Sequence, residues 1–320
     1  MMGKEKTKFN LSEFYSKFGI ILILLFMVII FSLVNSKFIS ANNIRNVIRQ
    51  VVVITILACG EQLMLISGMV DLSAGTVMAF GGTLSAYCVS ATQNVPLAIL
   101  VGLAGGLFFG VINGALITIF SIPAFIGTLA SMKMASGAIM WYTNGKNKSN
   151  LGDAYTWLGQ GYIGPIPVPV IIMVIALLIT YYVLAWTPAG RNIYAVGGNL
   201  QAAKATGIRV RNTQFFACVF SGLCAGLAGI VLMARLNSGQ PSTGQAGMEM
   251  DAITAVIVGG TSMSGGVGAI QNTIIGSLII GIIKNFMNLQ NIHSSIQDIV
   301  LGILICVAVI IDVQVRRSKV

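Results

Sequence analysis

The sequence is poor in charged side chains. Only 9% of its 320 residues are charged and 56% are hydrophobic, whereas about a quarter of a typical soluble domain is charged. It has one histidine, His293, and five cysteines that all fall in apolar runs without the spacing of metal ligands. This composition excludes an ordinary soluble domain. It predicts no metal site, no disulfide framework and no histidine-based catalytic set.

Motifs of nucleotide hydrolysis are also missing. The chain has no Gly-x-x-x-x-Gly-Lys-Ser/Thr phosphate loop. The glycine-rich stretch "GGTSMSGGVG" at residues 259–268 lacks the lysine that would neutralise phosphate, so it is interpreted as a flexible membrane turn. No convergent reactive set is visible either, which disfavours a membrane enzyme. We therefore expect no catalytic residues in this chain.

Apolar runs of nearly bilayer-spanning length follow one another along the chain. A further apolar run at residues 251–260 is too short to span about 30 Å alone and is interpreted as part of a broken or half-length helix. The predicted fold is an all-α polytopic membrane protein of about ten transmembrane helices, in which residues 1–320 form a single domain. The nine longer candidates are residues 18–34, 50–67, 75–92, 96–119, 124–141, 166–186, 214–234, 268–286 and 296–312.

The formal net charge of +10 is concentrated in three segments, residues 1–17, 187–213 and 313–320. Basic segments beside membrane spans are typically cytoplasmic, so both termini and the central segment are predicted to face the cytoplasm. The basic balance therefore reports orientation, and no nucleic-acid partner is expected. Three basic residues disagree, because this topology places them in an outside loop: Lys37, Arg45 and Arg49.

The segment at residues 187–213 contains a predicted short helix. Asn199 is a good N-cap, Leu200 to Thr206 favour a helix, and Gly207 supplies the left-handed residue that commonly ends one. A helix this short barely forms alone in water, so it is expected to dock against something. Three small residues would allow a close fit into a partner's groove, and an ordinary cytoplasmic loop remains an equal alternative. These residues are Ala202, Ala203 and Ala205.

Polar residues within the predicted spans are candidates for a solute pathway. In "SGMVDLSAG", Asp71 and Ser73 either lie beside the route of a polar solute, or Asp71 caps a half-helix by bonding amides near Ser73 and Ala74. Glu61 and Gln62 allow the same two interpretations. Asn113 either bonds between helices or faces a polar cavity. Asp251 lies in "GMEMDAITAVIVGGT", a weak repeat of residues 68–83, and matching breaks in two halves of a chain indicate a transporter's pathway.

Four glycines recur at every fourth position in "GLAGGLFFGVING". This spacing lets two helix backbones approach closely in lipid, so a packing role is predicted. The four are Gly102, Gly106, Gly110 and Gly114.

Several stretches resemble a known family. "GGNLQAAKATGI" resembles the coupling-helix motif of ATP-binding-cassette importer permeases, with Gln201 in place of the usual glutamate. "GMVDLSAG", "IPAFIGTLASM", "GRNIYAVGGN" and "ARLNSGQPSTGQAGMEMDAITAVIVGGTSMSGG" are similar to stretches of the ribose-type sugar permeases, in matching order over residues 40–312. In "TLASMKMASG" the arginine that the family often carries is replaced by Ser136, with Lys133 one turn earlier.

The resemblance implies a ten-helix subunit in a prokaryotic cell membrane. It would pair with a second permease copy, or a close relative, over cytoplasmic ATPase subunits that hold ATP and Mg. An extracytoplasmic binding protein would deliver the solute, a ribose-like sugar first of all, and residues 143–165 offer a landing site for it. An ion-coupled secondary transporter of a small polar solute is the alternative. The coupling-helix residues implied are Asn199, Gln201, Ala202, Ala203, Lys204 and Gly207.

Overall fold

The computed structural model describes residues 11–245 and 247–317. The remainder of the two expected tails, residues 1–10 and 318–320, lies outside the described residues. Residues 11–17, which were expected to belong to the first tail, form the beginning of the first helix.

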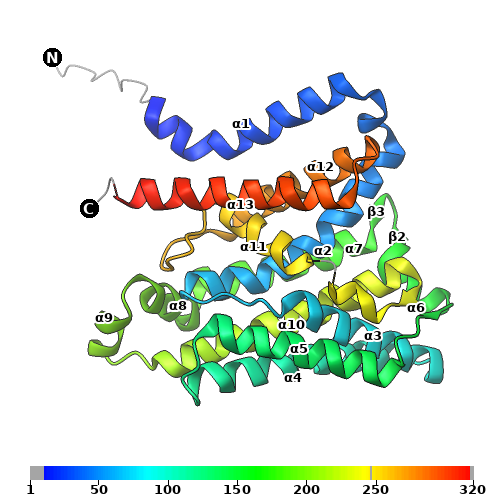
Figure 1. The fold of residues 1–320 in the computed structure, drawn as a ribbon, viewed down its shortest axis with the longest axis horizontal. Helices are drawn as coiled ribbons and strands as arrows, with labels where there is room; N and C mark the ends of the chain where they lie inside the picture. Colours follow the sequence, from blue (N-terminus) through cyan, green and yellow to red (C-terminus); the bar gives the residue numbers. More distant parts are fainter. Residues whose placement is uncertain (1–10, 246, 318–320) are drawn as a thin grey trace.

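The described chain is almost entirely helical (Figure 1). Its four strands have two residues each and form two antiparallel pairs, β1 (Lys148–Ser149) with β4 (Ser238–Gly239) and β2 (Tyr162–Ile163) with β3 (Ile166–Pro167). The helices are α1 (Leu11–Val34), η1 (Ser36–Ile39), α2 (Ala41–Ile66), α3 (Ala74–Thr92), α4 (Val95–Thr118), α5 (Ala124–Thr143), α6 (Asp153–Gln160), α7 (Val168–Trp186), α8 (Pro188–Gly198), α9 (Leu200–Ala205), α10 (Val210–Leu236), η2 (Pro241–Gln245), α11 (Met248–Val258), α12 (Ile270–Leu289) and α13 (Ser294–Arg317).

Six helices in the described ranges are long and apolar enough to cross a membrane, namely α2, α4, α7, α10, α12 and α13. This confirms the all-α polytopic class, but it does not support the expected count of about ten. α3 and α5 have 19 and 20 residues but carry more small and polar side chains. α11 has 11 residues and extends over only about 16 Å at 1.5 Å per residue.

α2 begins at Ala41 rather than at residue 50 because Ser40 caps it. The Ser40 hydroxyl accepts a hydrogen bond from the Asn43 amide at 3.3 Å. Asn43 is buried, and its side-chain amide exchanges hydrogen bonds of 2.8 and 2.9 Å with that of Asn285 on α12. The expectation of a loop is therefore wrong for Arg45 and Arg49, which lie on α2. Apolar run length does not detect a polar first turn.

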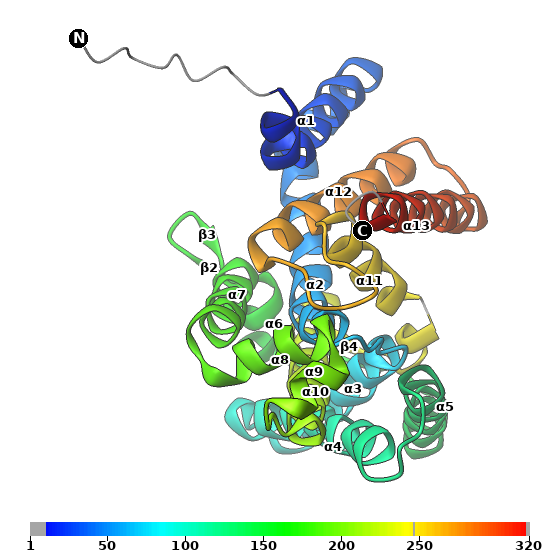
Figure 2. The ribbon, with the colours of Figure 1, turned by 90° about the vertical axis from the view of Figure 1, so that its left-hand side faces the viewer.

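α10 lies in the lower half of Figure 2 and packs against α2, α3 and α4. The glycine stripe of α4 faces it. A Cβ on Gly106 would overlap the backbone of Gly222 and Gly226, and one on Gly110 would lie 2.8 Å from the Cys218 carbonyl oxygen. At the two ends of the stripe, Gly102 lies against Ile230 and Gly114 against the Phe215 ring. The small residues therefore bring two backbones together where bulk would separate them.

The helices run between two ends of the molecule (Figure 1). One end carries α8, α9, the beginning of α1 and the end of α13. The opposite end carries α6 and the β2–β3 hairpin. The described parts of the three basic segments thus gather at one end.

Replacing Gly106 by alanine should destabilise the subunit, because a methyl group has no space between α4 and α10. The expected cost is about 1–3 kcal/mol. Gly137 on α5 is a matched control, since a Cβ there meets nothing within 4 Å. Thermal unfolding in detergent should show a lower midpoint for Gly106→Ala and no loss for Gly137→Ala. Equal midpoints for the two variants would contradict the packing role.

Candidate functional site

The connection between α2 and α3 brings a carboxylate into the interior of the protein. α2 ends at Ile66 and α3 begins at Ala74. Gly68 has a φ of 79°, a left-handed conformation that glycine adopts without strain, and so the chain turns back at this point. Asp71 lies in this break and is only 2% exposed.

Asp71 is held by a closed set of hydrogen bonds. Its Oδ1 accepts from the Ser73 amide at 2.9 Å and from the Ser73 hydroxyl at 2.5 Å, and its Oδ2 accepts from the Ser221 hydroxyl of α10 at 2.9 Å. The Asn113 side-chain amide of α4 donates to Ser73 Oγ at 2.8 Å. Asn113 therefore forms a hydrogen bond to another element, which is one of the two interpretations that the sequence allowed. These four residues join the break, α4 and α10.

The capping interpretation of Asp71 fits the geometry in part. Ser73 occupies the N-cap position of α3, but its own side chain makes no capping bond. Asp71 accepts the Ser73 amide instead, whereas no hydrogen bond joins it to the Ala74 amide in the described structure. The carboxylate therefore orders the residues that precede the helix.

Two more carboxylates, Glu61 of α2 and Glu249 of α11, lie near this network. Glu61 is fully buried, within electrostatic range of Asp71 and Glu249 and close to the Asp71 backbone amide. Glu249 packs against Gly75, the second residue of α3. Near this network, three described side chains have buried oxygens without a hydrogen-bond partner: both oxygens of Glu61, Oε2 of Glu249 and Oδ1 of Asn113.

Glu61, Asp71 and Glu249 are referred to below as the acidic junction. Buried polar groups are normally paired, and ionisable groups within membranes usually belong to functional sites. The acidic junction is therefore the strongest polar candidate in the interior. Sequence reasoning missed Ser221 and Glu249, although the acid in "GMEMD" was a usable signal for Glu249.

Gln62 belongs to a separate network. Its side-chain amide bonds the Thr261 hydroxyl at 2.9 Å and accepts from the Thr273 hydroxyl at 2.5 Å. Thr261 lies in the loop after α11, and Thr273 lies on α12. Gln62 thus ties α2 to the next two segments. Nothing in the sequence indicated Thr261 or Thr273.

Asp251 is also separate from the acidic junction's hydrogen bonds. On α11 it is 3% exposed and forms an ion pair of 2.5 Å with Lys284 of α12. Lys284 was missed, although a lysine inside the expected span 268–286 was a signal. The two copies of the weak repeat, which begin at Gly68 and Gly247, have similar backbone conformations at their first residue, since both glycines have positive φ.

The short helix α9 lies at the end of the bundle that also carries α8 (Figure 2). Asn199 Oδ1 accepts from the amides of Gln201 and Ala202 at 3.0 and 2.9 Å. The helix ends at Ala205, one position before the expected Thr206, and Gly207 follows with a φ of 83°.

The exposed side chains of α9 differ from the expectation at one position. Ala203 is 3% exposed, because α9 packs against α8 and α10 through this face. The expectation that Ala203 faces a partner is therefore wrong. The exposed residues of α9 are Leu200, Gln201, Ala202, Lys204 and Ala205.

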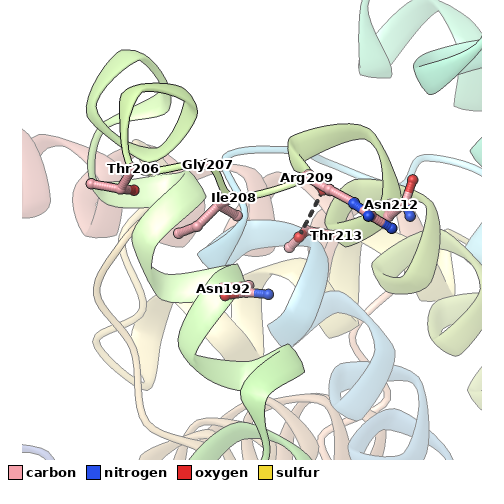
Figure 3. Close-up of a pocket in the computed structure, with 7 residues that line it drawn as sticks. All are labelled: Asn192, Thr206, Gly207, Ile208, Arg209, Asn212 and Thr213. Carbon is pink, nitrogen blue, oxygen red and sulfur yellow. Dashed lines mark hydrogen bonds between the residues drawn. The ribbon is translucent and has the colours of Figure 1, made fainter.

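A hollow of about 400 Å³ lies beside α9 (Figure 3). It is formed by α8, the turn after α9 and the beginning of α10. The Thr213 hydroxyl donates to the Arg209 carbonyl at 3.2 Å on its α10 side. The lining residues are Asn192, Thr206, Gly207, Ile208, Arg209, Asn212 and Thr213.

Helices interrupted around buried polar groups are a feature of membrane transport proteins. The sequence profile of the family described as "Branched-chain amino acid transport system / permease component" matches residues 43–309. The chain belongs to this permease family.

Individual relatives are similar over nearly their whole length. The chain is 39% identical to the ribose import permease protein RbsC of Haemophilus influenzae, with all of both chains covered. It is 40% identical to RbsC of Bacillus subtilis, with 96% of each covered. It is 32% identical to the L-arabinose transport system permease protein AraH of Escherichia coli, with 99% of this chain and 96% of AraH covered. No solved structure matches the chain.

These comparisons confirm the resemblance to the permease subunits of ribose-type ATP-binding-cassette importers. They give no support to an ion-coupled secondary transporter. The family is one of transport permease components. Its place is an inner membrane, which it crosses several times.

Replacing Asp71 by asparagine should distinguish the role of Asp71 in the structure of the break from the role of its charge in transport. The amide oxygen still accepts from Ser73, so the subunit should reach the membrane at a near-normal level, at a cost of about 0.5–2 kcal/mol. Solute uptake should fall much further than the subunit level. Asp71→Ala is the comparison, since it leaves buried donors unpaired at about 1–3 kcal/mol each. Immunoblots and uptake on the same membranes decide. Uptake by Asp71→Asn that falls only in proportion to its subunit level would contradict a role for the charge in transport.

Proposed function

We propose that this chain is the membrane-spanning subunit of an importer that passes a monosaccharide, most closely a ribose-like one, into the cytoplasm. The full-length identity of 39–40% to ribose import permeases carries the proposal. The L-arabinose relative AraH extends it to other small, uncharged polyhydroxy solutes. The family description names branched-chain amino acids, but the individual relatives named above transport sugars, and these decide the substrate class.

We propose ten crossings with both termini in the cytoplasm. The six long apolar helices together with α1, α3, α5 and the half-length α11 give this number. The gathering of α8, α9, the beginning of α1 and the end of α13 at one end (Figure 1) supports it. The basic residues of these segments favour the cytoplasmic side for this end.

At the cytoplasmic end, α9 is proposed as the coupling helix that docks on a separate ATPase. ATP and Mg would be held by that partner. The exposed face of α9, including Gln201 and Lys204, and the hollow beside it (Figure 3) supply the docking surface. Within the described side chains, Arg209 and Lys204 form no ion pair, so the surface suits an acidic groove.

A second permease subunit is proposed to cover α5. Lys133 lies near the middle of α5 with an exposed side chain, and it makes no hydrogen bond or ion pair with any described residue. A charge that faces lipid at this depth costs about 2.5–3.5 kcal/mol. Lys133 therefore faces the second subunit or an aqueous pathway between the two.

The outer end is proposed to receive an extracytoplasmic binding protein. Arg235 donates to the Arg49 carbonyl at 2.8 Å, and Arg49 donates to the Tyr162 hydroxyl at 3.2 Å. Neither arginine has an acidic partner in the described part of the chain. Two neighbouring cations without acids, beside residues 143–165, form a surface that attracts acidic side chains.

The acidic junction is proposed to lie on the solute pathway and to open to water during transport. Carboxylates bind sugar hydroxyls through hydrogen bonds, and the unpaired oxygens of Glu61 and Glu249 offer such acceptors. Because Asp71 already accepts three hydrogen bonds, it is proposed to act on the pathway through its charge and through the shape of the break.

The topology is tested by thiol labelling in a cysteine-free background. Lys148 and Arg209 are both exposed, at the β1 end and the α9 end of the bundle. A cysteine in place of Lys148 should react with an impermeant reagent added outside intact cells, and one in place of Arg209 should react only after permeabilisation. The reverse pattern would contradict the orientation and with it the docking of α9.

The function is tested by reconstituting the permease with its ATPase and binding protein and measuring uptake of labelled monosaccharides. Uptake should require ATP and should be greatest for ribose-like sugars. Ala202→Asp adds a charge on the exposed face of α9, where an acid near the helix N-terminus does not harm the helix, so it should abolish ATPase association and uptake. Ala202→Ser is the control. Uptake driven by an ion gradient without ATP would contradict the proposal.

A further inference from the structure

The end of α2 lies directly against α8. The Gly266 amide donates to the Ile66 carbonyl at 2.8 Å. Gly197 of α8 packs against the same carbonyl so closely that a Cβ would overlap the Ile66 oxygen and lie 2.6 Å from the Gly266 nitrogen. Backbone thus meets backbone at this contact, with no side chain between.

The loop between α11 and α12 completes the contact. Gly265 and Gly266 have φ values of 86° and 74°, which allow the loop to lie along the end of α8. The Tyr194 hydroxyl donates to the Gly268 carbonyl at 2.8 Å, and burial raises the pKa of Tyr194, so the hydroxyl keeps its proton. A Cβ on Gly268 would lie 2.7 Å from Gln62 Nε2. The loop is therefore held between α8 and α2.

α8 is continuous with α9 through a single residue. The Asn199 amide donates to the Ala195 carbonyl and ends α8, while its side chain caps α9. A displacement of α9 must therefore move the last turn of α8, where Gly197 lies. Because closely packed backbones cannot absorb such a movement by a change of rotamer, it passes to Ile66 and the loop.

We propose that Gly197 is the positioning residue that couples α9 to the acidic junction. This rests on the proposed function. The contact among Gly197, Ile66 and Gly266, called here the glycine joint, passes on movement that the ATPase imposes on α9. Ile66 is the last residue of α2, directly before the break that holds Asp71. The joint moves that break relative to α10 and so opens or closes the pathway.

The chain offers a matched pair for the test. Gly197 and Gly198 are neighbours at the end of α8, and alanine raises helix propensity at both. A Cβ on Gly198 meets nothing within 4 Å, whereas one on Gly197 overlaps Ile66. The two variants therefore differ in the joint and in little else.

Both variants are reconstituted with the ATPase and the binding protein. Gly198→Ala should behave as the unchanged complex. Gly197→Ala should still bind the ATPase and hydrolyse ATP at the basal rate, but uptake per ATP hydrolysed should fall about tenfold, as expected for a lost coupling contact. Stimulation of ATP hydrolysis by the loaded binding protein should be lost as well. Equal uptake per ATP in the two variants would overturn the proposal.

Tyr194→Phe keeps the test decisive if Gly197→Ala does not assemble. It removes only the hydroxyl that holds Gly268, so assembly should be unchanged while uptake per ATP falls several-fold; an unchanged ratio would overturn the joint. An unchanged complex that takes up no monosaccharide would contradict the proposed substrate. The joint is then judged by stimulation of ATP hydrolysis, which Gly197→Ala must abolish and Gly198→Ala must keep.

Discussion

The buried carboxylate of Asp71 is the constraint on which the rest of the structure depends. A membrane interior offers little water, so an interrupted helix and an acid can persist there only where protein groups satisfy them. Ser73, Ser221 and Asn113 do so from three elements. Their approach requires α4 and α10 to lie backbone to backbone, which the glycines at 102, 106, 110 and 114 permit.

The long helices could be predicted from the sequence because apolar run length carries most of their signal. Apolar run length did not predict the helix boundaries and short helices that depend on capping and on tertiary contacts. Ser40 extends α2 by polar turns that hold Arg45 and Arg49. α8 has Thr187 as its N-cap and a proline in its first turn. This local signal for a helix start was not used, because the prediction relied on apolar runs. The number of membrane crossings is harder to predict from apolar run length, because α3 and α5 carry many small and polar side chains and α11 is short.

The sequence predicted most of the residues of the candidate site, but it did not predict which of them bond to one another. Asp71, Ser73 and Asn113 meet in one network, whereas Gln62 and Asp251 belong to others. Contacts between residues 150 or more positions apart, such as Asp71 with Ser221, leave no trace in local spacing. The expectation that the Ala203 side chain faces a partner was wrong for the same reason, since tertiary packing decides which face of a short helix is covered.

In the proposed mechanism, the glycine joint and the acidic junction connect α9 to the interior. This mechanism requires the junction to become accessible to water during transport. Ser221 is 2% exposed and hydrogen-bonded to Asp71, so a cysteine there reports directly on opening. In a cysteine-free complex, Ser221→Cys should resist a small water-soluble thiol reagent at rest. It should react during turnover with ATP and sugar-loaded binding protein. The same slow reaction in both conditions would contradict a pathway through the junction.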